Sequence, residues 1–556
     1  MIGVIANSSE HAVVREFFEL FKTPWEFYRS RRQYEVLLCT ADEEFDDNCA
    51  PLILIYSGHK IPFDARQKIE ILSQQYSSNL SYQGNRIPIY GNLIAFQEDQ
   101  PSLLVEEQSR KPALYECQSS GAITMRIGYD IFAEVAALLT NGQPPAYADV
   151  PTMELHIALL RHLIVASGVP LVEVPPVPAG YQFIACLTHD VDHPSISPHK
   201  WDHTMFGFLY RATFGSLSSF LRRQTSFRSL TKNWAAVLRL PFVYAGFTKD
   251  FWSGFEDRYQ QIENGLRSTY FVIPFKNRPG RVPDDVAPKL RAAQYGAEDI
   301  AKSIEKIQGL GSEVGLHGID AWIDSASACK EIEEIRRLTG NTELGVRMHW
   351  LYYDQQSPIA LEQAGATYDS TIGYRETVGY RAGTTQAYKP FEAQHLLELP
   401  LHVMDTALFY PAYMGLSQRE AAILLSRMID KTVQFGGCIT INWHDRSLSP
   451  ERLWDASYRD LVQELKDRGA WFATAGQATS WFRKRRSVVF DEGCVATNGP
   501  DAGVSTERRH DVPGLTIRTH QARKSCNVGA FGSKGYVDSA LEQHFDEPVH
   551  AGQATD

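Results

Sequence analysis

The chain has 556 residues, 44% of them hydrophobic, and a formal net charge of -11 at pH 7. This length predicts two or three domains, and the acidic balance gives no reason to expect nucleic-acid binding. The eight cysteines form no CxxC pair, which is typical of reduced thiols in a cytoplasm. The start "MIGVIANSSEHAVV" lacks signal-peptide features, and no window approaches 18 apolar residues. We therefore expect a cytoplasmic protein without a transmembrane span.

The first third of the chain predicts a small domain and a joint. Residues 1–150 mix short apolar runs such as "PLILIYS" with helical stretches, which indicates a small α/β domain. "PTMELHIALLRHLIVASGVP" then has apolar residues at helical spacing and predicts an amphipathic helix, whose histidines we expect in the core or on the polar face. The Pro-rich "VEVPPVPAGYQ" follows, so 151–182 is interpreted as a helix and a Pro-rich joint.

From residue 183 onward, apolar strands alternate with helical patterns. Candidate strands cover 183–189, 268–274, 312–317, 344–350, 366–371, 396–403, 437–444 and 470–475, and helical patterns cover 297–310, 417–436 and 453–469. Such alternation predicts parallel strands, and this many favour a barrel. In a barrel of this kind the C-terminal ends of the strands build the active site.

Two further regions stand apart from this alternation. Residues 199–260 interrupt it after the first strand, and between 200 and 250 they carry eight Lys or Arg against two acids, with many aromatics. A helical lid packed on the barrel is favoured, and a membrane-surface or partner-binding helix is the alternative. Residues 487–556 are rich in Gly and polar residues and are predicted to be mostly disordered, with "VPGLTIRTH" as an isolated strand.

The stretch "FIACLTHDVDHP" (183–194) first indicates chemistry. An apolar run opens into a polar cluster, as at the end of a buried strand. Asp190 and Asp192 would share one side of that end, because side chains alternate with period two. Two carboxylates this close repel one another unless a cation or a proton lies between them. The stretch therefore indicates a metal or acid/base site, and a loop with two solvated acids is the alternative.

Four stretches at strand ends, "THDVD", "GLHGID", "GVRMHW" and "NWHD", together resemble the polysaccharide deacetylase family, carbohydrate esterase family 4. The resemblance covers roughly 183–482, and residues 1–180 are similar to the N-terminal extension of a bacterial subgroup. It implies a distorted (β/α)7-type barrel over 183–486, after the smaller α/β domain and before the disordered tail. It also implies a metal-dependent deacetylase.

The resemblance implies a metal site with one departure from the family. Asp192 matches a metal ligand and His317 the first His of the metal motif, but Ala321 stands where the second His belongs. His349 is favoured as the third ligand, since a catalytic zinc normally has three protein ligands. Asp320 and His193 are the alternative ligands. The expected cofactor is a divalent metal, zinc above all, and a degenerate site without metal is the other interpretation.

The remaining roles also come from the resemblance. Asp190 matches the general base, His444 the acid that protonates the leaving amine, and Arg347 the arginine that holds Asp190 ionised. Asp369 matches an acid that tunes Arg347 or His444, with an ordinary buried ion pair as the alternative. In "GYRAGT" (379–384) the expectation is that Tyr380 or Arg381 contacts sugar, or that the segment is a structural turn. Trp443 is a further expected sugar contact.

The sequence thus favours a hydrolase that removes N-acetyl or O-acetyl groups from an amino-sugar polysaccharide or its lipid-linked precursor. It would act in the cytoplasm, with the 199–260 insert against the anionic inner membrane face. A non-catalytic glycan-binding or scaffold protein on a degenerate barrel is one alternative. A metal-independent amidase acting on a cyclic amide is the other.

Overall fold

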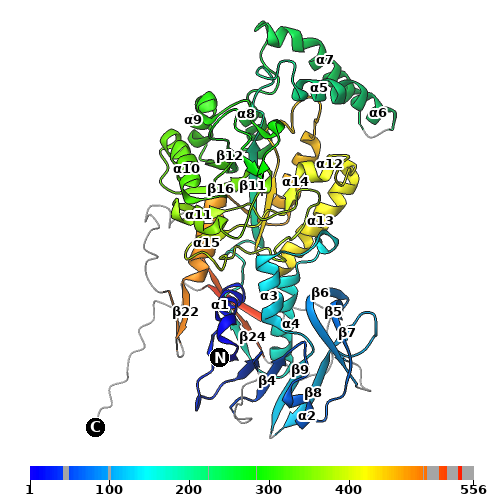
Figure 1. Cartoon of the computed structure of the whole chain (residues 1–556), viewed down its shortest axis with the longest axis vertical. Helices are drawn as coiled ribbons and strands as arrows, with labels where there is room; N and C mark the ends of the chain where they lie inside the picture. Colours follow the sequence, from blue (N-terminus) through cyan, green and yellow to red (C-terminus); the bar gives the residue numbers. More distant parts are fainter. Residues whose placement is uncertain are drawn as a thin grey trace, which may run out of the picture.

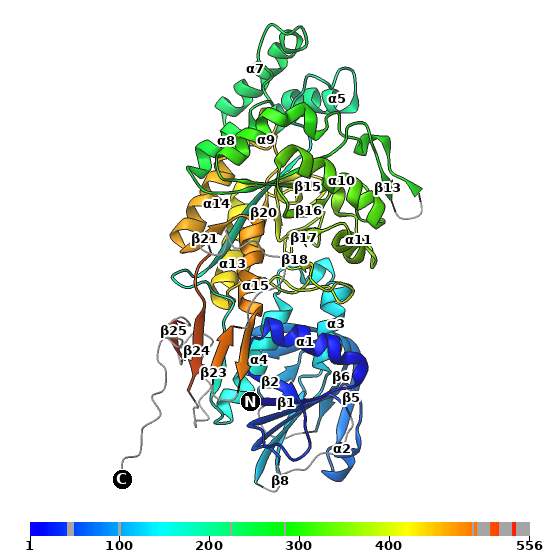
Figure 2. The same ribbon diagram turned by 90° about the vertical axis from the view of Figure 1, so that its left-hand side faces the viewer.

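The computed structural model describes residues 1–41, 49–97, 102–119, 121–222, 225–282, 285–491, 494–497, 512–521 and 536–540. The N-terminal part lies at one end of the long axis and the larger strand–helix part above it (Figures 1 and 2). A helical arm projects at the far end (Figure 1). The mixed α/β class expected for the chain is confirmed.

The N-terminal part contains a six-stranded sheet in the order β2-β1-β3-β4-β9-β8. The strands are β1 Ile2–Ile5, β2 Trp25–Phe27, β3 Val36–Cys39, β4 Leu52–Tyr56, β8 Leu114–Ser119 and β9 Ala122–Ile127. Only the β8–β9 pair is antiparallel among the pairings of this sheet. Because both faces are covered, β1, β3 and β4 are buried along their whole length.

Different elements cover the two faces of this sheet. Helices α1 (His11–Leu20), α3 (Ile131–Thr140) and α4 (Thr152–Ala166) share one hydrophobic cluster with alternate strand residues. The opposite strand residues pack on α2 (Pro62–Arg66) and the antiparallel strand β6 (Asn85–Phe96), which pairs with β5 (Ile71–Tyr82). Strand β7 (Leu104–Glu106) completes that second sheet. Helix α4 lies where the amphipathic helix was predicted.

The larger part is built on a nine-stranded sheet in the order β18-β17-β16-β15-β12-β11-β20-β19, with β21 also paired to β11. Its strands are β11 Phe183–Val191, β12 Thr269–Val272, β15 Glu313–Gly318, β16 Leu344–Met348, β17 Ala366–Asp369, β18 Leu397–Glu398, β19 Val403–Met404, β20 Cys438–Asn442 and β21 Ala470–Ala473. All their pairings are parallel. Each predicted strand from 183 onward is present, and 396–403 supplies the two edge strands.

The sheet curls, and its two edge strands, β18 and β19, follow one another in the sequence. Residues 399–402 connect β18 to β19, and they bond to both sides of the gap: the Leu399 amide donates to Asp369 and the His402 amide to Thr440. This segment bridges the edges where a ladder of strand bonds would close a regular barrel. The arrangement fits the expected distorted (β/α) barrel.

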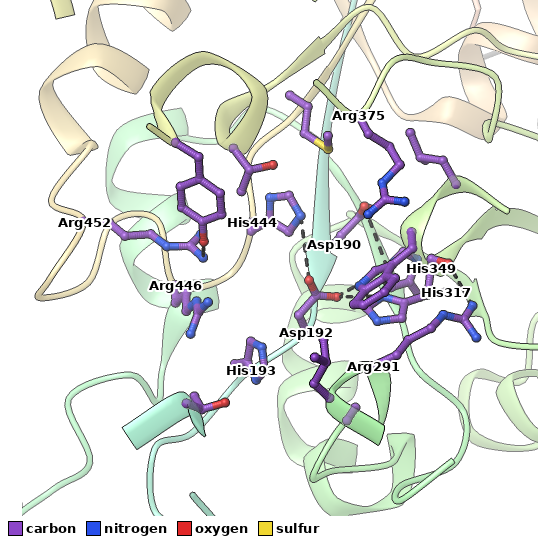
Figure 3. A pocket seen from close by; sticks show the side chains of 18 of the residues that line it. Asp190, Asp192, His193, Arg291, His317, His349, Arg375, His444, Arg446 and Arg452 are labelled. Atoms are coloured by element: carbon purple, nitrogen blue, oxygen red, sulfur yellow. Dashed lines mark hydrogen bonds and ion pairs between the residues drawn. The ribbon is translucent and has the colours of Figure 1, made fainter. Parts of the chain in front are cut away.

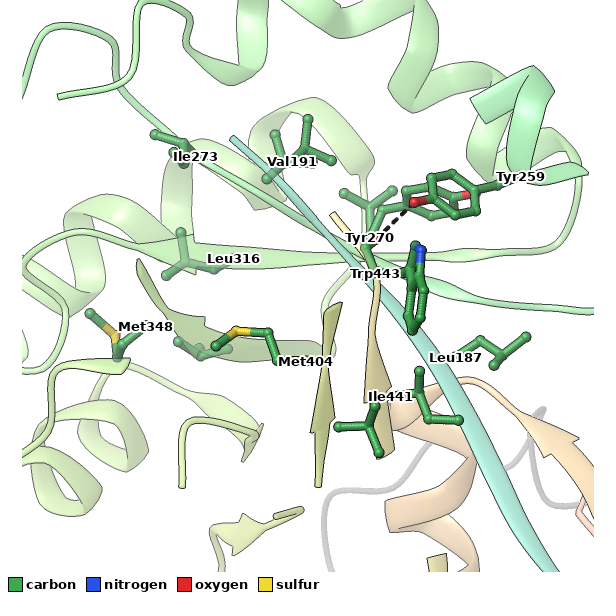
Figure 4. Packing of buried hydrophobic residues seen from close by; sticks show 14 of the residues in the cluster. Leu187, Val191, Tyr259, Tyr270, Ile273, Leu316, Met348, Met404, Ile441 and Trp443 are labelled. Carbon is green, nitrogen blue, oxygen red and sulfur yellow. Dashed lines mark hydrogen bonds between the residues drawn. The ribbon is translucent and has the colours of Figure 1, made fainter. Parts of the chain in front are cut away.

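Helices cover the outside of the curled sheet (Figure 2). They are α9 Ala301–Gly309, α10 Ser325–Thr339, α11 Ser357–Gln363, α13 Gln418–Phe435, α14 Asp455–Asp467 and α15 Ala475–Arg486, with the short α12 Asp405–Phe409 after β19. Leu187 and Val191 of β11 lie in the core beside these helices, with Leu316 and Ile441 from other strands (Figure 4). The even-numbered residues of β11 therefore face the other way, toward the sheet interior, and Asp190 is one of them.

The insert at 199–260 forms the helical arm, α5 His203–Tyr210, α6 Ser216–Leu221 and α7 Phe227–Tyr244, with a π-turn at Arg211–Gly215. Helix α8 (Phe255–Glu263) then returns the chain to β12. The arm has a small core of its own around Phe208 and Trp252. Among the described helices, none combines the length and apolar character that crossing a bilayer requires.

The described C-terminal residues form paired strands and not the single isolated strand that was expected. Strand β24 (Thr516–His520) is the middle of a three-stranded antiparallel sheet, between β10 (Leu171–Glu173) in the Pro-rich joint and β25 (Tyr536–Ala540). "VPGLTIRTH" is therefore paired, contrary to expectation. A hairpin of β22 (Val488–Asp491) and β23 (Cys494–Thr497) precedes it. The remaining positions predicted to be disordered lie outside the described residues.

A buried carboxylate fixes this C-terminal strand to the joint. Glu173 is 2% exposed and accepts hydrogen bonds from Arg161 at 2.8 Å and from His520 at 2.9 Å. Burial raises the pKa of Glu173, but Arg161 and His520 outweigh burial and hold this pKa well below its usual range. The ionised form is therefore the one that stabilises the folded chain.

We predict that Glu173→Gln lowers the free energy of unfolding by about 1–3 kcal/mol near neutral pH, because two charge-assisted hydrogen bonds are weakened. A depressed pKa contributes stability above the unfolded value of about 4.3, and this contribution is lost as the pH falls. Urea unfolding measured from neutral pH to below about pH 4 should show the difference in unfolding free energy between wild type and variant shrinking as the pH falls. A pH-independent difference would contradict the assignment. Glu107→Gln, in the more exposed pair with Arg86, is the control and should cost less than about 1 kcal/mol.

Candidate active site

A cavity of about 400 Å³ opens where the parallel strands of the larger part end. Six of the residues singled out from the sequence line it: Asp190, Asp192, His193, His317, His349 and His444. They come from β11, β15, β16 and β20 or from the residues just after these strands (Figure 3). The C-terminal ends of parallel strands meet at one edge of a sheet, which is why residues so far apart in the chain converge.

Asp192, His317 and His349 form a cluster of possible metal ligands. One ligand atom from each lies within 4.8 Å of the other two. Asp192 Oδ1 is 3.4 Å from His317 Nε2 and 3.4 Å from His349 Nδ1, and the two imidazole nitrogens are 3.1 Å apart. The structure thus brings together the two motif residues and the third residue that the sequence favoured.

The protonation of this cluster suits a divalent cation. His317 Nδ1 donates to the carbonyl oxygen of Arg347 at 2.9 Å, which leaves Nε2 as the ring nitrogen that faces the cluster. Asp192 Oδ1 is buried and, among the described residues, no donor hydrogen-bonds to it. Burial lowers the pKa of His349, which favours its neutral form. Two imidazole nitrogens and a carboxylate are a donor set that zinc accepts, with room left for water or substrate.

The electrostatics of Asp192 point the same way. Burial raises the pKa of Asp192, but His349, His317 and His444 outweigh burial, and the pKa lies well below its usual range. The group is therefore an anion within a ring of imidazoles. Such a charge distribution fits a cation that the residues share.

The backbone just after β16 is strained to place His349. Trp350 has φ +65° and Leu351 has φ +56°, both in the left-handed region that bulky residues seldom adopt. Each such residue costs about 1–3 kcal/mol and persists only where the surroundings enforce it. The strained residues line the cavity, so the strain lies at the site itself.

Asp190 is held in place by side chains from two other strands, β16 and β20. Its Oδ1 accepts from Arg347 at 3.0 Å and its Oδ2 from the Asn442 side chain at 2.7 Å. Arg347 also donates to Thr188 at 2.6 Å and lies over the Phe271 ring at 4.5 Å. A carboxylate with these two partners is held in one orientation, as a general base must be.

His444 is paired with a carboxylate that the sequence did not single out. His444 Nδ1 lies 2.6 Å from Asp405 Oδ1, and its backbone amide donates to the other carboxylate oxygen at 2.8 Å. Burial lowers the pKa of His444, but Asp405, Asp192 and Asp190 outweigh it and raise the pKa to about 10. Its Nε2 faces Asp192 Oδ2 at 3.7 Å. The imidazolium is thus a proton donor aimed at the cavity.

The arm-side wall of the cavity is cationic. Arg211, Arg446 and Arg452 line it and share one buried carboxylate, Glu451, at 2.7, 3.9 and 3.7 Å. In Figure 3 Arg446 and Arg452 lie on the opposite side of Asp192 from His317. Three guanidinium groups against one carboxylate leave a positive balance, which favours an anionic group on a bound molecule.

Asp369 does not lie beside His444. Its carboxylate accepts from the Ser370 amide at 2.8 Å, and burial raises its pKa to about 6. Its neighbour is the buried Glu398, whose pKa is raised well above its usual range by burial and by Asp369. Of the two partners expected for Asp369, Arg347 is the one whose charge acts on it, lowering its pKa against burial, whereas Asp405 pairs with His444.

The expected sugar contacts lie away from the cavity. Tyr380 is fully buried and donates to the Met428 carbonyl at 3.1 Å, and the Arg381 carbonyl accepts from the Gln143 amide at 2.7 Å. The "GYRAGT" segment therefore joins the larger part to the N-terminal part, as the structural-turn interpretation held. Trp443 is fully buried in the core around Tyr259 (Figure 4). These placements contradict a direct sugar contact in this cavity.

The two alternative ligands are also engaged elsewhere. Asp320 Oδ1 accepts from the Arg281 amide at 2.8 Å, and the residue does not line the cavity. His193 lines the cavity, but its Nδ1 faces His199 Nε2 at 3.3 Å. Burial holds the pKa of His193 well below its usual range.

Sequence reasoning missed two residues of the site. Asp405 follows directly after the short strand β19, and Asn442 ends β20 just before the "WHD" of its motif. An acid at a predicted strand end was the signal available for Asp405. For Asn442 no signal existed, because its role depends on the register that pairs β20 with β11.

Comparison with known proteins gives only distant structural matches. No family model matches the chain, and no curated protein matches it in sequence. A protein from Mycobacterium smegmatis provisionally named a polysaccharide deacetylase is 20% identical with a TM-score of 0.35, covering 56% of this chain and 95% of that one. The carbohydrate deacetylase Agd3 is 9% identical with a TM-score of 0.34, covering 95% and 92%.

A family 4 acetyl xylan esterase from Clostridium thermocellum, solved with a cobalt ion, is 14% identical with a TM-score of 0.24, covering 54% of this chain and 91% of that one. These solved structures are thus carbohydrate deacetylases and an acetyl esterase by name. Because the TM-scores are so low, the matches carry no weight for the function of this chain, which depends on its own site geometry.

We predict that Asp192→Asn and His317→Ala each weaken zinc binding by more than about 100-fold, since each removes a ligand. Equilibrium dialysis with elemental analysis would measure this. Asp320→Asn and His193→Ala are the matched controls and should keep zinc near wild-type levels. Equal zinc content in all four variants would contradict the assigned cluster.

Proposed function

We propose that this protein is a metal-dependent hydrolase that removes acetyl groups from an amino-sugar glycan or its lipid-linked precursor, with zinc as the metal. The observation that carries this proposal is the convergence of three groups in one cavity. An oriented carboxylate, Asp190, and a protonated imidazole, His444, flank the ligand cluster around Asp192. Metal-assisted hydrolysis of an acetamide uses this combination of groups.

The roles follow from the partners of each group. A bound divalent ion would polarise the acetyl carbonyl and favour ionisation of water. Asp190 would take a proton from the attacking water, because Arg347 and Asn442 fix its carboxylate at the edge of the cluster, 3.8 Å from His317 Nε2. Asp190 therefore acts as the general base.

His444 would protonate the leaving nitrogen. Asp405 binds its Nδ1, so the Nε2–H is the proton directed into the cavity. The base and the acid are separate groups, one in β11 and the other just after β20, the strand paired with it. This separation lets one group receive a proton while the other gives one up in the same turnover.

The cationic wall bears on the substrate. Arg211, Arg446 and Arg452 favour a glycan that carries a carboxylate or phosphate near the acetylated sugar. The deciding experiment measures acetate release from neutral and anionic acetylated amino-sugar glycans, with zinc and after chelation. Zinc-dependent release supports the proposal. Release that survives chelation would indicate a metal-independent amidase, and glycan binding without release would indicate a non-catalytic protein.

We predict that Asp190→Asn and His444→Ala each reduce turnover by about 10²–10⁴-fold, because each removes a proton-transfer group. Zinc content should stay within about twofold of wild type, since neither is a ligand of the cluster. His395→Ala, at an exposed histidine that does not line the cavity, is the control for the imidazole and should retain turnover. Wild-type turnover in either catalytic variant would refute its role.

We predict that Asp405→Asn lowers kcat by at least about tenfold while KM and zinc content stay unchanged, because the amide cannot hold the His444 imidazolium in the same way. Steady-state kinetics separate the two constants. Asp405→Glu should recover part of the lost kcat. A change confined to KM would place Asp405 in substrate binding instead.

A further inference from the structure

Exposed apolar side chains concentrate on the helical arm. Eleven of the twenty large hydrophobic side chains that are exposed in the described chain lie between residues 201 and 247. Trp201 and Phe247 are each 80% exposed, and Leu238 is 74% exposed. Scattered single residues of this kind are normal, but a contiguous set marks an interaction surface.

Helix α7 has two apolar faces. Its core face carries Ala236, Leu240 and Val243. A second stripe, Phe227, Trp234, Leu238 and Phe242, is exposed and repeats at helical spacing. At 100° per residue these four lie within about 80° of one another, on the side away from the core face.

Cations run along one edge of this exposed stripe. Arg228, Lys232 and Arg239 follow one another at i+4 and i+7 and are exposed, about 100° from the apolar stripe. No carboxylate of the described chain forms an ion pair with any of them. A helix with an apolar stripe and a cationic flank is suited to lie in the interface plane of an anionic bilayer.

The preceding helical turns repeat the pattern. Phe206, Tyr210, Phe214, Leu217 and Leu221 are exposed at steps of three or four residues through α5, the π-turn and α6. The aromatic content suits the headgroup region, where aromatic rings find both apolar and polar surroundings. Both stripes therefore belong to one structural unit at the far end of the molecule (Figures 1 and 2).

The charge of the arm favours a bilayer over a second copy of this chain as its binding partner. The whole chain has a net charge of -11, but residues 200 to 250 carry eight Lys or Arg against two acids. A two-fold contact through the arm would bring both cationic sets together, because such an interface uses the same patch twice. An anionic lipid surface instead complements the cations while the rings enter the headgroup layer.

We propose that the helical arm, residues 201–247, docks this protein on an anionic lipid bilayer through the exposed stripes of α5–α7. His203, Thr204 and Arg211 of the arm also line the cavity. Docking would therefore hold the cavity close to the lipid surface. The proposal concerns this surface alone and does not depend on the hydrolase activity.

The test is flotation of the full chain with phosphatidylcholine vesicles, with and without phosphatidylglycerol. Wild type should bind the anionic vesicles, and added salt should weaken the binding. The double variant Trp234→Ala with Leu238→Ala should bind at least about tenfold more weakly. Replacing Arg228, Lys232 and Arg239 by Gln should weaken binding by about 100-fold, since each cation near the surface contributes about a fivefold effect.

Tyr76→Ala is the matched control, because Tyr76 is 75% exposed but lies on β5 in the N-terminal part. It should bind like the wild type. Unchanged vesicle binding in both arm variants would overturn the proposal. A second result would also overturn it: wild type that does not bind the vesicles but self-associates in sedimentation without lipid, with the arm variants abolishing this self-association.

Discussion

The site depends on giving different partners to two neighbouring carboxylates, Asp190 in β11 and Asp192 just after its end. Asp190 and Asp192 point to the same side of β11, and their repulsion would destabilise the strand end without separate partners. Asp190 receives a guanidinium and an amide, whereas Asp192 faces imidazoles from two other strands. Both oxygens of Asp190 therefore accept hydrogen bonds from protein donors, whereas Asp192 keeps an oxygen that a cation could bind. The roles proposed for them, base for Asp190 and metal ligand for Asp192, are based on these surroundings.

Patterns within short stretches predicted much of this structure. Strand β11 and the helices α13 and α14 follow from apolar runs and periodicity, and the strand ends placed His317 and His444 in one cavity. The failures have a common physical cause. Asp405 and Asn442 owe their roles to pairing between distant strands, and the 379–384 turn owes its place to packing on the N-terminal part. Local sequence could mark Asp405 only as an acid near a strand end, and it carries no record of the contacts themselves.

The two parts of the molecule are joined by buried polar contacts. Arg485 of α15 is 2% exposed and donates to the carbonyls of Glu19 and Leu20 at the end of α1. Glu154 of α4 accepts from Thr384 at 2.6 Å, at the end of the 379–384 turn. Removing either partner would leave an uncompensated polar group in the interior, so the orientation of the two parts is firmly fixed. The N-terminal part thus braces the side of the sheet remote from the cavity.

The pairing of β24 with β10 has a consequence for biosynthesis. His520 follows Glu173 by 347 positions, so the joint strand leaves the ribosome long before its partner exists. Nascent chains fold from the N-terminal end, yet this three-stranded sheet can be completed only after the barrel has been translated. Strand β10 of the Pro-rich joint therefore gains its partner last. A chain truncated after the larger sheet would leave the edge of β10 unpaired.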